Sequence, residues 1–217
     1  MAQPCRRSFR KIRNYLRRNA ESCRSFRILR YALHMPGRIY NEIFDIAVEQ
    51  NGFVTAVDAH EAGFDVRRLN DLKQRGQAER VAVGLYRLFA IPPTHFDPYV
   101  QAALWHHKAG VISHETALDL WDVCDINPGK IHVTIPTKPR LTRKPPAAYA
   151  IHVKDLQPQD RTMLESVTIV TLETAIRQCA TMQTRPDLLR QAIENGRKIG
   201  KLRPAAADQL LRDLNLA

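Results

Sequence analysis

Residues 52–89 read GFVTAVDAHEAGFDVRRLNDLKQRGQAERVAVGLYRLF, a run in which glycines separate short patterned segments. Thr55 is a natural N-cap, because its hydroxyl can accept a hydrogen bond from a backbone N–H of the first helical turn. Asp58, three residues later, places a negative charge at the same positive helix end. These two residues predict a short helix over residues 56–62, which Gly63 ends.

Asp65 repeats the N-cap signal directly after that turn. Over residues 66–74, the spacing of Leu69 and Leu72 predicts a second helix with one inward apolar face, and Gly76 ends it. Two short helices around a glycine-containing turn are the helix-turn-helix arrangement. The outer face of the second helix is left to polar and cationic side chains.

A β-hairpin is predicted next, because two β-rich runs flank Gly84 within residues 78–89. Upstream, residues 40–50 have the apolar spacing of an amphipathic helix. Three helices followed by a hairpin are the element order of a winged helix. We therefore predict an α+β protein in which residues 39–92 form a winged helix-turn-helix.

DNA binding is the function that this arrangement favours. A helix fits the major groove of DNA, where arginine can pair with guanine and asparagine or glutamine with adenine. Residues 39–92 carry a net charge of −2, yet all six of their basic residues lie at the second helix of the motif or in the hairpin. The hairpin arginines are expected to meet phosphate or the minor groove. The predicted DNA-contacting residues are Thr55, Arg67, Arg68, Asn70, Lys73, Gln74, Arg80 and Arg87.

Residues 1–38 form a strongly cationic arm. They hold 11 of the 33 Lys and Arg residues and one of the 22 Asp and Glu residues, so the arm carries +10 of the net charge of +11. Such an arm raises non-specific affinity for nucleic acid through counterion release, without sequence preference. Phe9, Ile12 and Leu16 fall on one helical stripe, which predicts a basic amphipathic helix when the arm is bound.

Other interpretations of the arm stay open. Met35 offers an alternative translation start, which would make residues 1–34 a mis-annotated extension. The arginine-rich, acid-poor composition also fits a transit peptide, and a basic amphipathic helix also suits a membrane surface. No apolar run approaches the roughly 18 residues that a membrane helix needs, and no apolar signal segment follows the basic start. We expect a cytoplasmic protein that does not bind a membrane.

Pro92 and Pro93 mark the expected boundary to a second domain, residues 93–217. The patterns predict a small mixed α+β unit of helices, a sheet and further helices. The predicted strands cover residues 130–135, 149–153 and 167–170, and the predicted helices cover residues 98–107, a segment capped by Ser113, and residues 171–180, 186–196 and 204–214. A basic loop follows the first strand and is expected either to contact phosphates of DNA or RNA or to be an ordinary solvated loop. Its cations are Lys138, Arg140, Arg143 and Lys144.

The second domain has no recognisable catalytic motif. The four cysteines form no C-x-x-C pair, and no H-E-x-x-H, G-x-S-x-G or P-loop is present. His132 and His152 share one strand parity, so they approach each other if their strands pair, either as a ligand pair or as two polar-face histidines. His114 lies at a spacing that does not suggest a ligand. We expect no cofactor, no metal site and no enzymatic activity.

The run at residues 52–89 resembles the N-terminal winged-helix domain of AbiEi-type antitoxins, which belong to type IV toxin–antitoxin systems. Residues 110–136, GVISHETALDLWDVCDINPGKIHVTIP, and residues 167–180, VTIVTLETAIRQCA, are similar to parts of the second domain of these proteins. The resemblance therefore extends over about residues 40–215. In the first domain it rests on Gly52, Thr55, Ala62, Gly63, Leu72, Gly76 and the segment Gly84-Leu85-Tyr86-Arg87-Leu88.

This resemblance implies a transcriptional repressor that binds double-stranded DNA of its own promoter. It also implies a nucleotidyltransferase-like toxin encoded next door, which the antitoxin counteracts without a stable complex. Solitary relatives are also known. Winged helices often bind DNA as dimers or as tandem copies, so a homo-oligomer is one expectation, and no heptad repeat indicates an interface.

Two other functions compete with repression. The first is a non-catalytic protein-interaction module that binds a toxin or a second copy of the chain. Its candidate contacts are Phe96, Trp105 and Trp121, for which core packing is the other interpretation. The second is an enzyme such as a nuclease or nucleotidyltransferase, which the absence of a paired-carboxylate or carboxylate–lysine constellation disfavours.

Overall fold

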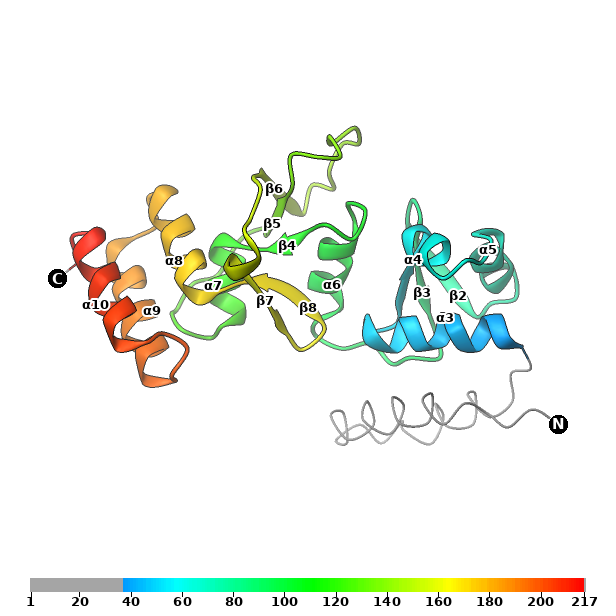
Figure 1. The fold of residues 1–217 in the computed structure, drawn as a ribbon, viewed down its shortest axis with the longest axis horizontal. Helices are drawn as coiled ribbons and strands as arrows, with labels where there is room; N and C mark the ends of the chain where they lie inside the picture. The colour runs from blue at the N-terminus through cyan, green and yellow to red at the C-terminus, as the bar shows by residue number, and fades with distance from the viewer. Residues whose placement is uncertain (1–36, 217) are drawn as a thin grey trace. The chain divides into compact units, whose positions relative to one another are not determined.

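The computed structural model describes residues 37–216, which divide into two compact units, residues 37–108 and residues 109–216 (Figure 1). The amphipathic helix expected around Phe9, Ile12 and Leu16 lies outside the described residues. Over the described residues the chain is a mixed α+β protein with two sheets, which confirms the predicted class. None of the helices in this part of the chain has the length and hydropathy needed to cross a membrane.

Most of the predicted elements of the first unit are present. In chain order, the unit consists of a helix, a strand, two helices, a β-hairpin and a final helix. The elements are α3 (Arg38–Glu49), β1 (Phe53–Thr55), α4 (Ala56–Glu61), α5 (Arg67–Gln74), β2 (Ala78–Ala82), β3 (Leu85–Leu88) and α6 (Asp97–Leu104). The segment directly before α4 is the strand β1. It pairs with β3 and so completes an antiparallel sheet of order β1-β3-β2.

One hydrophobic core holds these elements together. α3 contributes the face expected from its spacing, including Ile43 and Phe44, and α5 contributes Leu69 and Leu72. Tyr86 and the other buried residues of the hairpin fill the same core from the sheet side. Burying a large apolar side chain contributes about 1.5–3 kcal/mol, so this shared core fixes α5 against the hairpin.

The predicted cap of α4 is confirmed, and it is reciprocal. The Thr55 hydroxyl accepts a hydrogen bond from the Asp58 N–H at 3.0 Å, while the Asp58 carboxylate accepts from the Thr55 N–H at 2.7 Å. Gly84 supports the same helix end from the hairpin turn. It has a φ of 72°, a conformation that favours glycine, and its carbonyl accepts the Ala56 N–H at 2.7 Å.

The Asp58 carboxylate is also the hub of a buried network. With 3% of its side chain exposed, it accepts hydrogen bonds from the Gln50 amide at 3.0 Å and from the Lys108 ammonium at 2.5 Å. Lys108 also pairs with Glu61 at 3.0 Å. Burial alone would lower the pKa of Lys108, but the bonds to Asp58 and Glu61 outweigh it and raise the pKa. The last residue of the unit is thereby tied to α4.

The first unit continues through α6, beyond the boundary expected at Pro92 and Pro93. Asp97 is the first residue of this helix. Its carboxylate accepts the Thr94 N–H at 2.9 Å and the Arg87 guanidinium at 3.0 Å. The hairpin therefore holds the start of α6 through a charged pair that a sequence pattern does not reveal.

The second unit is built on a five-stranded sheet of order β6-β5-β4-β8-β7. The pairs β5–β6 and β4–β8 are parallel, and the other two neighbouring pairs are antiparallel. α7 packs on α8, which packs on α9 and α10. The elements are β4 (Val111–Ile112), α7 (His114–Leu120), β5 (Ile131–Ile135), β6 (Tyr149–Val153), a 3-10 turn η1 (Pro158–Asp160), β7 (Arg161–Leu164), β8 (Val167–Val170), α8 (Leu172–Thr181), α9 (Pro186–Lys198) and α10 (Pro204–Asp213).

The strands β4 and β7 were not predicted for this unit, and α9 extends two residues beyond its expected end. β4 has two residues and β7 is a mostly exposed edge strand, so neither has the alternating pattern that identifies a half-buried strand. α9 does not end at Gly196 but continues to Lys198. Gly196 packs closely there, because a Cβ at this position would lie 2.5 Å from Leu172 Cδ2 and would force that side chain to shift.

The Asp58 network predicts an unequal response to two acid substitutions on the same helix. Asp58→Ala removes the carboxylate half of the α4 capping box and the partner of partly buried Lys108, so we expect the free energy of unfolding to fall by about 3 kcal/mol. Glu61→Ala is the matched control. Glu61 is 60% exposed, and its loss should cost less than about 1 kcal/mol.

Urea unfolding in a Trp121→Phe background measures both changes, because Trp105 of the first unit is then the sole tryptophan of the chain. Equal effects of the two substitutions would contradict the role assigned to Asp58.

Candidate nucleic-acid interface

α5 presents a polar and cationic outer face. Leu69 and Leu72 point into the core, and this anchors the helix by its inner side. Arg67, Arg68, Lys73 and Gln74, all predicted to contact DNA, have exposed side chains on the same helix. Because the helix is fixed on one side and solvated on the other, these four side chains can reach a ligand without moving the backbone.

The acidic neighbours of the two α5 arginines hold them loosely. Arg67 lies 3.9 Å from Asp65, and Arg68 lies 3.8 Å from Asp71, with both arginines more than half exposed. Exposed pairs at such distances contribute about 0–1 kcal/mol and are screened by salt. A phosphate or a base edge therefore displaces these carboxylates from the arginines at little cost in free energy. Asp65 also accepts the Arg67 N–H at 2.8 Å, so its predicted capping contact is made although α5 begins at Arg67.

Asn70 is held in place by the hairpin. Its side-chain oxygen accepts a hydrogen bond from the Tyr86 hydroxyl at 2.8 Å, and Tyr86 itself is 2% exposed. This bond joins β3 to the middle of α5. The half-buried Asn70 is thus a positioning residue. Its side-chain NH₂ group is not used in this bond and is the part that could contact a base.

Thr55 does not offer its side chain to DNA, contrary to the expectation. It is 3% exposed, and its hydroxyl both accepts from the Asp58 N–H and donates to the Asp58 carboxylate at 2.7 Å. The capping box therefore uses the hydroxyl donor that a phosphate contact would need.

Arg87 is also engaged inside the unit rather than presented on the hairpin. Its side chain is 11% exposed, and it donates to Asp97 at 3.0 Å and to the Ile91 carbonyl at 3.2 Å. The guanidinium also lies 5.8 Å from the centre of the Phe53 ring. Arg80 differs, because it is exposed on β2 with one bond to the Ala82 carbonyl at 3.3 Å. Of the two predicted hairpin contacts, Arg80 is the one that faces solvent.

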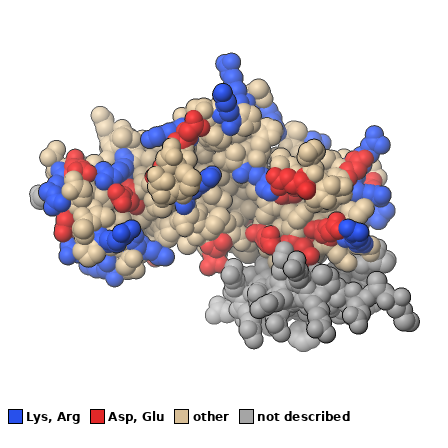
Figure 2. Space-filling view, viewed as in Figure 1, with Lys and Arg blue, Asp and Glu red and all other residues tan. Residues whose placement is uncertain are grey.

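The charges of the first unit are separated in space. Figure 2 shows Lys and Arg side chains gathered over α5, whereas Asp and Glu side chains lie along α3 and α4. The acids of those two helices include Glu42, Asp45, Glu49 and Glu61. The unit has a small net charge, but its α5 side is positive, which is the arrangement that attracts and orients a polyanion.

The basic loop of the second unit joins β5 to β6. Lys138, Arg140 and Lys144 are exposed and Arg143 is half-buried. Lys and Arg side chains stand out over this loop in Figure 2. Asp155 anchors its start, because it accepts the Thr137 hydroxyl at 2.7 Å and the Thr137 N–H at 3.0 Å. These two bonds lower the pKa of Asp155, the hydroxyl bond contributing more. The anchored loop keeps its exposed cations available for phosphate.

The aromatic residues considered as protein contacts are packed within their own units. Trp105 is 8% exposed. Trp121 donates its ring N–H to the Val170 carbonyl at 3.1 Å and lies under the Lys201 ammonium. Phe96 is half-buried, with its ring 3.9 Å from that of His95. The structure thus gives these aromatic side chains internal partners.

The second unit also brings together three histidines. His132 and His152 approach each other across β5 and β6, which confirms the expectation based on strand parity. His114 joins them, although its spacing in the sequence gave no such indication. A strand as short as β4, which delivers His114 to the site, leaves no pattern from which this could have been found.

Comparison with known protein families gives one match, which lies in the first unit. Residues 41–88 match the family AbiEi_4, described as a transcriptional regulator, AbiEi antitoxin. The match runs from α3 to the end of β3, and over this segment it confirms the resemblance inferred from the sequence. A search of curated proteins found no match. The likeness inferred for the second unit stays a prediction.

Because the two hairpin arginines have different environments, we expect their removal to lower the stability of the unit by different amounts. Arg87→Ala leaves Asp97 partly buried without its cation, so we expect the free energy of unfolding to fall by about 2–3 kcal/mol. Arg80→Ala, the matched control, should stay within about 0.5 kcal/mol of the parent chain because the side chain is exposed. Urea unfolding followed by Trp105 fluorescence measures both. A stable Arg87→Ala variant would mean that the pair with Asp97 does not support the unit.

Proposed function

We propose that residues 39–92 form a winged helix-turn-helix and that the chain is a DNA-binding transcriptional repressor. The observation that carries the proposal is the exposed cationic face of α5, which lies in the segment that matches AbiEi antitoxin regulators. α4 and α5 supply the two helices of the motif, and β2 and β3 supply the wing.

In this proposal α5 enters the major groove with its N-terminal end leading. Recognition helices contact base edges mainly through their first residues, which here are Arg67 and Arg68. Each can form two hydrogen bonds to guanine. Lys73 and Gln74 lie one to two turns further on, where the helix approaches the opposite phosphate backbone or a neighbouring base. Arg80 on the wing contacts phosphate.

The hydrogen bonds described above assign supporting roles to the remaining predicted contacts. Asn70 orients α5 through Tyr86, while Thr55 and Arg87 maintain the fold. The specific interface is therefore small, and the basic arm of residues 1–38 supplies additional affinity that does not depend on sequence. The cations of the loop between β5 and β6 are proposed as further phosphate contacts.

The biological role that we propose is that of the antitoxin in a type IV toxin–antitoxin system. The chain would bind the promoter of its own operon and repress it, and a nucleotidyltransferase-like toxin would be encoded next door. Support comes from the family match over the first unit and from the chemistry of α5. Because a single winged helix covers a short site, we propose that two copies bind a two-fold symmetric operator.

The role of α5 predicts a loss of affinity that depends on position. Arg67→Ala or Arg68→Ala should weaken binding to the cognate promoter fragment by about 1–3 kcal/mol, roughly 5–150-fold. The control is Arg38→Ala, which removes an exposed arginine at the junction of the arm and α3 and should weaken binding to the promoter and to a scrambled duplex equally. Titrations of a labelled promoter duplex at fixed salt give the affinities.

Equal losses at positions 38, 67 and 68 would mean that net charge, and not the α5 face, determines binding. That result would contradict the proposed recognition helix. Circular dichroism of each variant checks that the fold is retained, which the exposure of all three side chains leads us to expect.

A further inference from the structure

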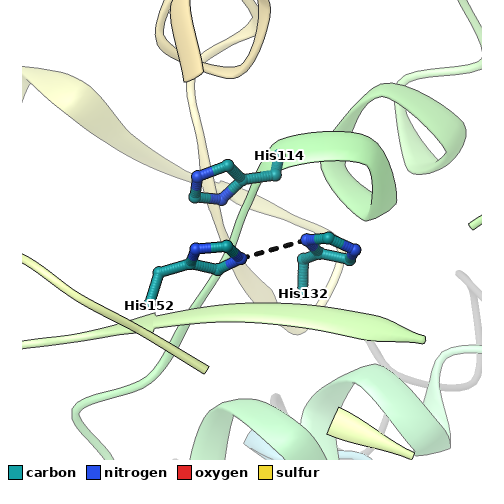
Figure 3. A group of neighbouring side chains, drawn as sticks. All are labelled: His114, His132 and His152. Carbon is teal, nitrogen blue, oxygen red and sulfur yellow. Dashed lines mark hydrogen bonds between the residues drawn. The ribbon is translucent and has the colours of Figure 1, made fainter. Parts of the chain in front are cut away.

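Three histidines converge in the second unit from three different elements. His114 begins α7, His132 lies on β5, and His152 lies on β6 (Figure 3). β5 and β6 are parallel, with His132 opposite Ala150 and His152 opposite Thr134, so the two histidines share one face of the sheet. The Ser113 N–H bonds to the His132 carbonyl at 3.0 Å, and this places His114 beside them.

The distances between the rings are those of groups that can share one ion. His132 Nδ1 lies 3.0 Å from His152 Nε2, and one ring nitrogen of each histidine lies within 4.8 Å of those of the other two. Figure 3 shows the His114 ring stacked over that of His152, with their centres 3.6 Å apart. Nitrogens bound to one tetrahedral zinc ion at about 2.0–2.1 Å are separated by roughly 3.3 Å. Side-chain rotations that open the stack of His114 on His152 would bring the three nitrogens to bonding distance.

The surroundings hold the rings in position. His114 Nδ1 lies 2.9 Å from the Ser113 hydroxyl, which in turn accepts a hydrogen bond from Thr134 at 2.8 Å. His114 also has a φ of 53°, a left-handed conformation that is uncommon for residues other than glycine. Hydrogen bonds from hydroxyl groups or carboxylates to a ligand histidine are the usual means of orienting it toward a metal.

Burial favours the neutral form of the three imidazoles. Burial lowers the pKa of His114 to about 3, with smaller effects from His152, His132 and Lys154. Burial likewise lowers the pKa of His132 and His152. Neutral imidazoles keep a lone pair for coordination, whereas protonated ones do not.

The buried Gln178 amide is bonded to the backbone of His114. The Gln178 side chain, 7% exposed, accepts the His114 N–H at 3.2 Å through its oxygen. Its amide nitrogen is buried and has no hydrogen-bond partner among the described residues. A buried donor without an acceptor costs about 1–3 kcal/mol, so an acceptor held beside His114 would relieve that cost.

We propose that His114, His132 and His152 bind a divalent transition-metal ion, with zinc as the best-fitting ion. Three imidazole ligands and one open position are a known zinc arrangement, and copper and nickel also accept imidazole. This replaces the expectation of no metal site. The ion would join α7, β5 and the edge strand β6, and so would stabilise the sheet margin from which the basic loop emerges.

The test uses the full chain, treated with a chelator and then titrated with Zn²⁺ by calorimetry and with Co²⁺ by visible absorption. We expect one ion per chain, cobalt bands typical of tetrahedral coordination and a higher Tm with zinc. His152→Gln should lower the zinc affinity at least about 100-fold, and Ser113→Ala about 10-fold or more through loss of ring orientation. The control is His60→Gln, which removes an exposed histidine of α4 and should change nothing.

Zinc X-ray absorption of the loaded parent chain gives an answer that does not depend on any variant folding. Three imidazole ligands in the first coordination sphere support the site. The proposal is overturned if the parent chain binds no zinc in a one-to-one ratio, if the bound zinc has sulfur or mainly oxygen neighbours, or if His60→Gln loses as much affinity as His152→Gln. In that case the three histidines are a hydrogen-bonded and stacked cluster only.

Discussion

The carboxylate of Asp58 is the point on which the first unit depends. It is buried, and it accepts hydrogen bonds from the Thr55 backbone and hydroxyl, the Gln50 amide and the Lys108 ammonium. A buried charge is tolerated only when it is paired and hydrogen-bonded, so these partners must all be in place when the unit is folded. They come from the end of α3, the start of α4 and the last residue of the unit. One side chain thereby ties two neighbouring segments to Lys108, which lies 50 residues further along the chain.

The alignment of α4 in turn determines what α5 presents. The two helices are separated by a short turn, and the hairpin holds α5 through the bond between Tyr86 and Asn70. With its apolar side in the core, α5 can only turn Arg67 and Arg68 toward solvent. The second unit contributes differently: its sheet carries a basic loop and, beside it, the histidine cluster. A metal bound there would stabilise the same strands that begin and end the loop.

Local patterns predicted most of the helices and the hairpin, because caps, glycines and apolar spacing act within a few residues. Thr55 illustrates both the success and the limit. Its capping role was predicted, yet it was also assigned a DNA contact that the cap itself excludes. Arg87 and Asp97 show the same limit, since neither residue indicates that it pairs with the other. His114 was missed because its position depends on a two-residue strand and a left-handed backbone, and neither leaves a trace in residue spacing.

Fluorescence anisotropy with the chain's own promoter and a scrambled duplex, over a salt series, tests the central claim most directly. It should compare the full chain with a chain that begins at Met35. The account predicts that both forms prefer the promoter by at least tenfold, about 1.4 kcal/mol, while the shorter form binds every duplex more weakly and with a smaller salt dependence. Loss of all binding with the arm, and no preference for the promoter in either form, would contradict recognition of DNA sequence by α5.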